Sequence, residues 1–454
     1  MPSDRRLLLC LVPLLTALLF VVLFGPIEQA PLELSLALGA AGIAWLVAVR
    51  RASQGGLELA VLVAGAIAMR LIVFAHEPGF SDDVYRSVWE GAVVLEGISP
   101  YAFAPEAERL VELRLAMPEL YAALNNPDIS AAYPPCTQAA CAGMVALARS
   151  LGHEGLSAVP FVRGFFALCD LLVLWPLVVL LRRARLPVGL ALVWGWSPLV
   201  SIEFAGSGHF DSLGILLLLA SLASLPAPNE SGRGRRLGAC VLLALAILVK
   251  YLPLCALPFV VRGQGFVRGA GRALLVVVLC AAGFAPLLAL EGGGSGLGGG
   301  LSEYGLRWES TSLVYRWIEP AFAQLFERDG SWLDARRLGR LAIGVVWLAW
   351  GLLAWRRGRP AVAATGTMIA AFLVLSPTLH PWYLTWVLPF VALRRPGLDR
   401  TAWLLLVAAA PLFYLTLVRW RLEEVWEEPV WLWPAIAVPF LLLQGAGSLI
   451  VRRA

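Results

Sequence analysis

The sequence predicts an all-α, polytopic membrane protein in which residues 1–454 form a single domain. Hydrophobic residues make up 59% of the chain and charged residues only 15%, a balance that argues against a soluble enzyme. Apolar runs long enough to cross a bilayer recur from one end of the chain to the other. The seven cysteines show no metal-ligand or disulfide spacing, so we expect neither a zinc site nor a disulfide framework.

Arginines separate many of the apolar runs, and the positive-inside rule places them on the cytoplasmic face. The first run follows one such cluster and lacks a small-residue cleavage site, so we expect a retained anchor and cytoplasmic termini. With the charge distributed in this way, membrane lipids are expected partners and nucleic acid is not. The clusters are Arg5-Arg6, Arg50-Arg51, Arg182-Arg183-Arg185, Arg233-Arg235-Arg236, Arg356-Arg357-Arg359, Arg394-Arg395-Arg400 and Arg452-Arg453.

We expect about 12 or 13 membrane helices. Two stretches leave the count open. Residues 134–181 contain two candidate helices, but the expected sides of the flanking segments allow only one membrane crossing there. The first helix is short enough to be re-entrant or interfacial. For residues 237–261, the expected sides of the flanking segments require an even number of membrane crossings. A break at Lys250-Tyr251-Leu252-Pro253 would divide this stretch into two half-helices and so allow an even number. The remaining segments lie near 7–25, 32–49, 57–75, 189–205, 209–226, 272–290, 341–356, 361–378, 381–394, 401–418 and 430–450.

Two long loops are expected outside the cell membrane, at residues 76–133 and 291–340. The second begins with a glycine-rich run, residues 292–300, which composition predicts to be a flexible linker. The first carries Asp82-Asp83 directly after an apolar segment. Ser81 is suited to cap a helix starting at this pair, and the apolar spacing that follows predicts an amphipathic helix lying on the membrane surface.

Taken alone, Asp82 and Asp83 are more often a helix cap than a catalytic pair. Other polar residues lie on the same predicted face. His209 and Asp211 form the tip of a short hairpin, and His380 begins an aromatic stretch ending at Tyr383. Each has a plain structural reading, as a solvated turn or an interfacial aromatic belt.

Lys250 is the single lysine of the chain and interrupts an apolar run. A lysine at such depth either binds an anion or extends its amine to the interface, and the sequence favours neither reading. Arg86 lies one helical turn from Asp82 and Asp83, where it could pair with them or hold an anion.

Seven short motifs occur in series over about residues 57–393. Through these motifs taken together, the sequence resembles the GT-C type polytopic glycosyltransferases. The resemblance is to the bacterial polyprenol-phosphate-mannose-dependent mannosyltransferases, which are related to the GPI-anchor alpha-1,4-mannosyltransferase. The motifs are Ser81-Asp82-Asp83-Val84-Tyr85-Arg86, Trp89-Glu90-Gly91, Gly97-Ile98-Ser99-Pro100-Tyr101, Tyr133-Pro134-Pro135, Gly208-His209-Phe210-Asp211, Lys250-Tyr251-Leu252-Pro253 and His380-Pro381-Trp382-Tyr383.

The resemblance implies an inverting hexosyl transfer, with mannose the expected sugar, from a polyprenyl-phosphate donor to a lipid-linked or envelope glycan acceptor. The site would face the periplasmic or external side of the plasma membrane. Ser87, Ser99 and Phe210 depart from the family's usual residues, at positions that could tune the choice of acceptor or sugar.

The resemblance also assigns roles to the motif residues. Asp82 would be the base, and Asp83 would position the acceptor or, with Asp82, a divalent Mg²⁺ or Mn²⁺ ion. Lys250 and Arg86 would hold the donor phosphate. The sugar and acceptor pocket would comprise Tyr85, Tyr101, His209, Asp211, His380 and Tyr383. A transporter or lipid flippase, and a non-catalytic scaffold subunit, are the alternatives.

Overall fold

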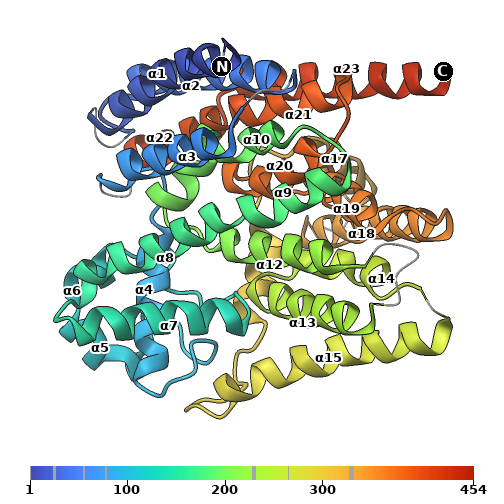
Figure 1. The fold of residues 1–454 in the computed structure, drawn as a ribbon. Coiled ribbons are helices and arrows are strands. Elements are labelled where there is room, and N and C mark those ends of the chain that lie inside the picture. Colours follow the sequence, from blue (N-terminus) through green and yellow to red (C-terminus); the bar gives the residue numbers. More distant parts are fainter. Residues whose placement is uncertain are drawn as a thin grey trace.

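The computed structural model describes residues 2–23, 27–54, 57–76, 79–226, 232–263, 265–326 and 332–453. The chain is 75% helical and has no strand in these ranges, as the sequence predicts (Figure 1). The first helices are α1 (Pro2–Leu23), α2 (Pro31–Ala52), α3 (Leu59–Phe74), α4 (Asp83–Leu95), α5 (Val111–Ala116), α6 (Pro118–Ala122) and α7 (Pro135–Ser150).

The central helices are α8 (Val159–Leu172), α9 (Leu174–Arg183), α10 (Leu192–Gly195), α11 (Pro198–Ser201), α12 (Asp211–Ser224), α13 (Arg233–Val249), α14 (Leu257–Val260) and α15 (Phe266–Leu288). The last are α16 (Gly299–Arg307), α17 (Tyr315–Phe326), α18 (Trp332–Arg356), α19 (Ala361–Leu375), α20 (Leu388–Ala392), α21 (Leu398–Ala409), α22 (Tyr414–Glu423) and α23 (Leu432–Arg453).

Within the described ranges, five helical segments have the length and apolar character needed to span a membrane. A sixth forms if the bent segment 188–206 counts as one span, and five further apolar helices are shorter. The chain is therefore a multi-pass helical protein, and the figure of 12 or 13 crossings stays a prediction.

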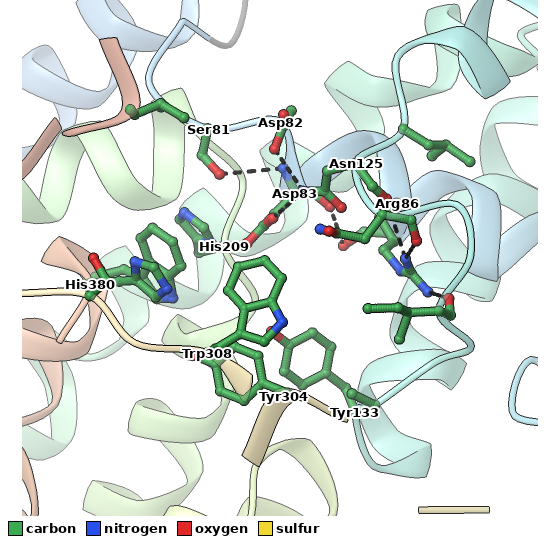
Figure 2. A pocket seen from close by; sticks show the side chains of 18 of the residues that line it. Ser81, Asp82, Asp83, Arg86, Asn125, Tyr133, His209, Tyr304, Trp308 and His380 are labelled. Atoms are coloured by element: carbon green, nitrogen blue, oxygen red, sulfur yellow. Dashed lines mark hydrogen bonds and ion pairs between the residues drawn. The ribbon is translucent and has the colours of Figure 1, made fainter. Parts of the chain in front are cut away.

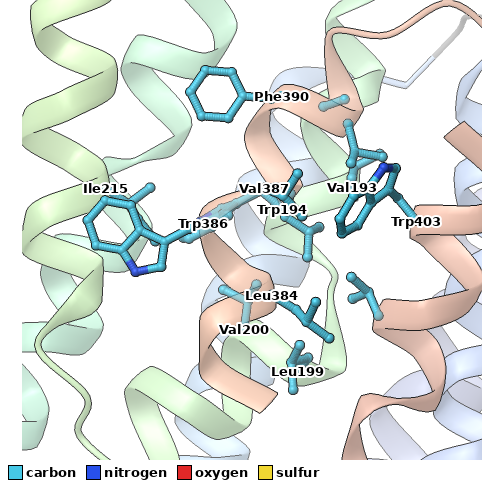
Figure 3. Packing of buried hydrophobic residues seen from close by; sticks show 14 of the residues in the cluster. Val193, Trp194, Leu199, Val200, Ile215, Leu384, Trp386, Val387, Phe390 and Trp403 are labelled. Atoms are coloured by element: carbon cyan, nitrogen blue, oxygen red, sulfur yellow. The ribbon is translucent and has the colours of Figure 1, made fainter. Parts of the chain in front are cut away.

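The large hydrophobic core lies where α10 and α11 meet the segment around α20. Trp194, Trp386 and Phe390 pack there with aliphatic side chains from α10, α11 and α12 (Figure 3). All three rings are buried. These segments are short and bent, and their large rings fill the space between them. This packing fixes the position of the loops at their ends.

The segment predicted as one helix near 189–205 is broken. Trp196 and Ser197 separate α10 from α11, and the two halves meet at 54°. Pro198 starts α11, where its missing N–H is tolerated, and the Ser197 hydroxyl accepts a bond from the Val200 N–H at 3.4 Å. The second half then widens into a π-helix over Ile202–Gly206.

The predicted break at Lys250 is present. Helix α13 ends at Val249, Lys250 is extended, and a 3-10 turn over Leu252–Ala256 leads into α14. The Arg236 guanidinium donates to the Arg262 carbonyl at 3.5 Å, so the chain after the break returns to lie beside the start of α13. The Thr137 hydroxyl donates to the buried Val249 carbonyl at 2.7 Å, which satisfies a backbone acceptor left by the break.

Helix α4 starts where the sequence predicts, but its surroundings differ from the prediction. Its apolar face packs against α7 and α8, and Val84, Val88 and Trp89 are buried in a second core. Protein rather than lipid therefore covers its apolar face, and a position of this helix at the membrane surface stays a prediction. An amphipathic pattern cannot distinguish these two partners.

The close contact of α4 with α7 gives a stability prediction. A Cβ atom on Gly91 would lie 2.8 Å from the backbone carbon of Cys141, whereas a Cβ on Gly143 meets no atom within 4 Å. We expect Gly91→Ala to destabilise the protein by about 1–3 kcal/mol through overpacking. The control Gly143→Ala should stabilise it by roughly 0.5–1 kcal/mol through helix propensity. Thermal melting in detergent checks both, and equal shifts would contradict the packing.

The glycine-rich run at 292–300 is folded against the loop at residues 76–133, and the flexible-linker prediction is wrong. Backbone bonds of 2.9 Å join Glu291 to Gly97 and Ser99. Gly296 has a φ of +72°, and a Cβ there would lie 2.3 Å from the Tyr101 carbonyl oxygen. The glycines therefore permit close backbone approach, which composition alone does not distinguish from flexibility.

Candidate active site

One cavity of about 660 Å³ lies between the two long loops at residues 76–133 and 291–340. Its walls come from the start of α4, the loop before α7, the tip between the π-helix and α12, α16 with the residues after it, residues 380–382, and α22 with Trp426. Figure 2 shows the carboxylates and aromatic rings that face it. Segments from both halves of the chain thus meet at one site.

Asp82 and Asp83 both line this cavity. The amide nitrogen of Asn125 donates to Asp82 Oδ1 at 2.7 Å and to Asp83 Oδ1 at 2.8 Å. Asp82 occupies the N-cap position of α4, yet its side chain forms no capping bond; the Ser81 hydroxyl instead accepts from the Asp83 N–H at 3.3 Å. Both carboxylates thus remain available to the cavity, and the simple capping interpretation does not account for them.

The environment of Asp83 raises its pKa to about 6. Burial is the main cause because it disfavours the charged form, and the neighbouring Asp82 charge adds to it. The Asn125 hydrogen bond and the positive charges of Arg86 and Lys250 oppose the rise. A carboxyl with a pKa this close to neutrality is suited to accept a proton during catalysis.

Arg86 lines the cavity, but its guanidinium is already bound. It pairs with Glu90 at 2.9 Å, donates to the Asn126 carbonyl at 2.9 Å and also donates to the Ile129 carbonyl. These bonds fix the loop that presents Asn125. The expected pairing of Arg86 with Asp82 or Asp83 is absent among these contacts, because Glu90 lies one turn further along the same face of α4.

Lys250 lies behind the cavity wall. Its amine pairs with Asp211 at 2.6 Å and sits 4.4 Å from the centre of the Tyr383 ring. Trp386 donates its ring N–H to the same Asp211 oxygen at 2.5 Å. The Tyr383 hydroxyl bonds to that of Tyr304. Lys250, Asp211 and Tyr383 therefore support the wall from behind and are not among the residues that line the cavity.

Tyr85 and Tyr101, the other two expected pocket residues, also lie outside the cavity lining. Tyr85 packs against the second core. The Tyr101 hydroxyl donates to the Tyr133 carbonyl at 2.9 Å, and its ring is buried. The structure therefore gives both tyrosines packing positions.

His209 and His380 do line the cavity, and Trp382 lies between them. The Trp382 ring stacks on His209 with centroids 4.1 Å apart and on His380 at 4.4 Å. Trp308 meets His380 edge-on at 6.5 Å. Figure 2 shows Trp308 and Tyr304 beneath the carboxylates. Aromatic faces next to carboxylates suit a sugar ring, which presents apolar C–H faces and polar edges.

The side chains around Asp82 and Asp83 do not form a suitable set of ligands for a divalent ion. No group of three or more His, Cys, Asp or Glu side chains in the described part of the chain is arranged to hold a metal. The Asn125 NH₂ group, a donor, points at both carboxylates. Hard cations need several oxygen ligands, and these residues do not supply them for the Mg²⁺ or Mn²⁺ ion considered from the sequence.

Several site residues carried no signal in the sequence. Asn125 is 43 positions from Asp82, and Trp308 and Tyr304 belong to a loop with no recognised motif. Their participation depends on how the two long loops pack together. Trp420 and Trp426 near the chain's end also line the cavity.

Two family models match the chain. Residues 15–263 match the N-terminal domain of the alpha-(1->6)-mannopyranosyltransferases, the MptA/MptB family. The chain belongs to this family. Residues 316–419 match the MptB C-terminal domain. Asp82 and His209 fall in the first match and His380 in the second, so the cavity is built from both.

Two relatives from Mycobacterium tuberculosis show the extent of the similarity. "Alpha-(1->6)-mannopyranosyltransferase A" is 27% identical over 388 residues, which cover 77% of this chain and 68% of the relative. "Alpha-(1->6)-mannopyranosyltransferase Rv1459c" is 29% identical over 199 residues, 39% of this chain and 32% of the relative. No solved structure matches the chain significantly.

The family membership confirms the expected class, a membrane glycosyltransferase of the mannosyltransferase type. The transporter, flippase and scaffold alternatives gain no support from these relatives.

Proposed function

We propose that this MptA/MptB-family protein transfers a mannosyl residue from a polyprenyl-phosphate donor to a hydroxyl of a lipid-linked or envelope glycan. The reaction takes place on the non-cytoplasmic face of the membrane. The observation that carries the proposal is the carboxylate pair Asp82-Asp83, held by Asn125 at the edge of a cavity lined by aromatic rings. Arg50 and Arg51 lie at the end of α2, just before α3 begins, and Asp82 lies after the other end of α3. If the arginines face the cytoplasm, as the positive-inside rule predicts, Asp82 lies on the opposite side.

Asp83 is the better placed of the two acids to serve as the base. Its carboxylate lies on the His209 side of the pair (Figure 2), and its pKa of about 6 matches proton abstraction near neutral pH. Asp82 then orients the acceptor through the Asn125 bridge. This reverses the two roles that the resemblance assigned.

The chemistry follows from the good leaving group. The acceptor oxygen forms a bond to the anomeric carbon as its proton moves to Asp83. The bond between that carbon and the phosphate oxygen breaks, and the phosphate leaves with the electron pair. One carboxylate base is enough for such an inverting displacement. The phosphate requires only a cation to stabilise its charge.

Arg307 is the cation that we assign to the donor phosphate in place of Lys250. Its side chain lines the cavity and is 69% exposed, and its partner Glu303 is 45% exposed. Such an exposed pair contributes little, so Arg307 can exchange Glu303 for a phosphate at small cost. Lys250 and Arg86 are bound to other groups.

We expect Arg307→Gln to raise the KM for the donor roughly 10- to 150-fold, because one charged hydrogen bond is worth roughly 1.5–3 kcal/mol and about 1.4 kcal/mol is a factor of ten. The kcat value should change less than KM. The matched control is Arg316→Gln, an exposed arginine of the same loop that does not line the cavity. Steady-state kinetics with increasing donor concentration measure both, and an unchanged donor KM in Arg307→Gln removes this role.

The proposed function is tested by mass spectrometry of envelope glycans and glycolipids from cells with and without the protein. We expect the loss of mannose-bearing species and the accumulation of a shorter acceptor. Restoration by the wild-type chain, but not by Asp83→Asn, ties the change to this site. An unchanged glycan profile contradicts the proposal.

A further inference from the structure

Arginines gather at one end of the helix pair α13 and α15 without acidic residues beside them in the sequence. The two helices lie side by side (Figure 1). Arg236 lies in the first turn of α13, and Arg268 and Arg272 lie in the first two turns of α15. From 212 to 290 the described residues include no Asp or Glu, and Glu230, the one acid of this stretch, lies outside them. The described part of the stretch therefore supplies no negative charge to balance these arginines.

The loop between the two helices brings their guanidinium groups together. Arg272 donates to two carbonyls of the loop 261–263, at 3.0 Å and 3.3 Å, and Arg236 donates to the carbonyl between them at 3.5 Å. Arg268 lies one helical turn before Arg272 and so on the same face of α15. The charges of Arg236 and Arg268 both act on that of Arg272. The carbonyls satisfy N–H donors, but the repulsion among three like charges remains.

A signal for membrane topology alone does not require this arrangement. Arginines that only mark the cytoplasmic side extend into water, as the exposed Arg50 does at the end of α2. Arg272 is instead 7% exposed, and the Arg236 Nε is buried without a hydrogen-bond partner. Both helices follow a glycine that offers no side-chain cap, and neither has an acid in its first turn, so the positive ends of their dipoles add to the charge. Buried charge of one sign is costly, and a bound anion would offset that cost.

The surroundings of the arginines favour a phospholipid over a free anion. Phe266 and Val267, in the same turn of α15 as Arg268, are 90% and 81% exposed. Helix α15 has the length and apolar character of a membrane span. Exposed apolar side chains next to arginines suit the boundary at which acyl chains meet headgroups. A guanidinium group binds phosphate oxygens through paired N–H donors, so one lipid molecule can satisfy both kinds of side chain.

We propose that Arg236, Arg268 and Arg272 bind the phosphate of an acidic phospholipid at the shared end of α13 and α15. Helix α13 separates Arg236 from Lys250 by roughly 20 Å, so this site is distinct from the sugar-transfer cavity and does not depend on the proposed function. Three guanidinium groups exceed the charge of one phosphate diester, so cardiolipin, with two phosphates, should bind more tightly than phosphatidylglycerol. The lipid would hold together two helices, one ending beside the cavity wall and the other leading into the loop at 291–340.

Thermal melting of the purified protein in detergent tests the chemistry of the ligand. We expect added phosphatidylglycerol to raise the melting temperature and cardiolipin to do so at a lower concentration, because a ligand that binds only the folded state stabilises it. Phosphatidylcholine at the same mole fraction should leave the melting temperature unchanged. An equal rise with phosphatidylcholine, or with millimolar inorganic phosphate alone, overturns the proposal.

Native mass spectrometry with phosphatidylglycerol tests the residues. Arg268 is exposed, so Arg268→Gln should fold normally, and we expect its Kd to rise roughly fivefold, the contribution of one arginine near an anionic headgroup. Arg236→Gln should raise the Kd further, because the Arg236 guanidinium is partly buried. Arg50→Gln, an exposed arginine on the same predicted face, is the matched control and should leave the Kd unchanged. A folded Arg268→Gln protein with wild-type affinity overturns the proposal, whether or not the protein transfers sugar.

Discussion

Asp83→Asn is expected to lower kcat by roughly 100- to 10,000-fold, the usual contribution of a positioned general base. The substitution keeps the side-chain size and the contact with Asn125, so the donor KM should change little. Asp82→Asn is the matched control. It removes the adjacent charge but keeps an amide oxygen that can accept from the Asn125 NH₂ group, and we expect a decrease of about tenfold. Transfer kinetics at saturating donor compare the two, and a larger loss in Asp82→Asn would return the base to Asp82.

The pH dependence follows from the same group. Asp83 must be ionised to accept a proton, and its pKa is raised to about 6 by burial and by Asp82. The wild-type kcat should therefore fall as the pH decreases through about 6. In Asp82→Asn the neighbouring negative charge is gone, so this limb should move to lower pH. A limb that stays in place would show that Asp83 is not the titrating group.

Lys250→Met is expected to destabilise the protein by about 3–5 kcal/mol, the range for breaking one side of a buried ion pair. Asp211 is completely buried, and the substitution would leave its charge with the Trp386 N–H as its remaining partner. Because this pair joins the break after α13 to the start of α12, the cavity wall should loosen with it. The melting temperature of purified protein in detergent measures the loss.

The double variant Lys250→Met with Asp211→Asn is the control for this prediction. Removing the second charge should recover much of the lost stability, since no uncompensated ion remains. Lys250→Arg, which keeps the charge, should be milder than Lys250→Met. A stable Lys250→Met protein with weakened donor binding would instead support the phosphate role that the sequence suggested.

Patterns formed by residues close together in the sequence predicted much of the fold. The break at Lys250 and the start of α4 depend on residues close in sequence, and both are present. The bend at Ser197 and Pro198 was missed because the apolar run continues through it. The glycine-rich run was misjudged because close packing and flexibility require the same residue.

The candidate site was predicted less completely, for a similar reason. Asp82, Asp83, His209 and His380 are on the cavity because each lies next to a chain segment that ends there. Asn125 and Arg307 come from loops whose packing is set by long-range contacts. Arg86 was assigned to an anion, although its spacing from Glu90 already indicated an ion pair along one helix face.

The central claim is that this chain uses a lipid-phosphate sugar and the Asp82-Asp83 cavity. The most direct measurement is sugar transfer by purified protein in liposomes, with radiolabelled polyprenyl-phosphate mannose compared with a nucleotide-linked mannose. We predict label in an acceptor glycolipid from the first donor only, and none with Asp83→Asn. Transfer from the nucleotide donor, or undiminished transfer by Asp83→Asn, would contradict the account.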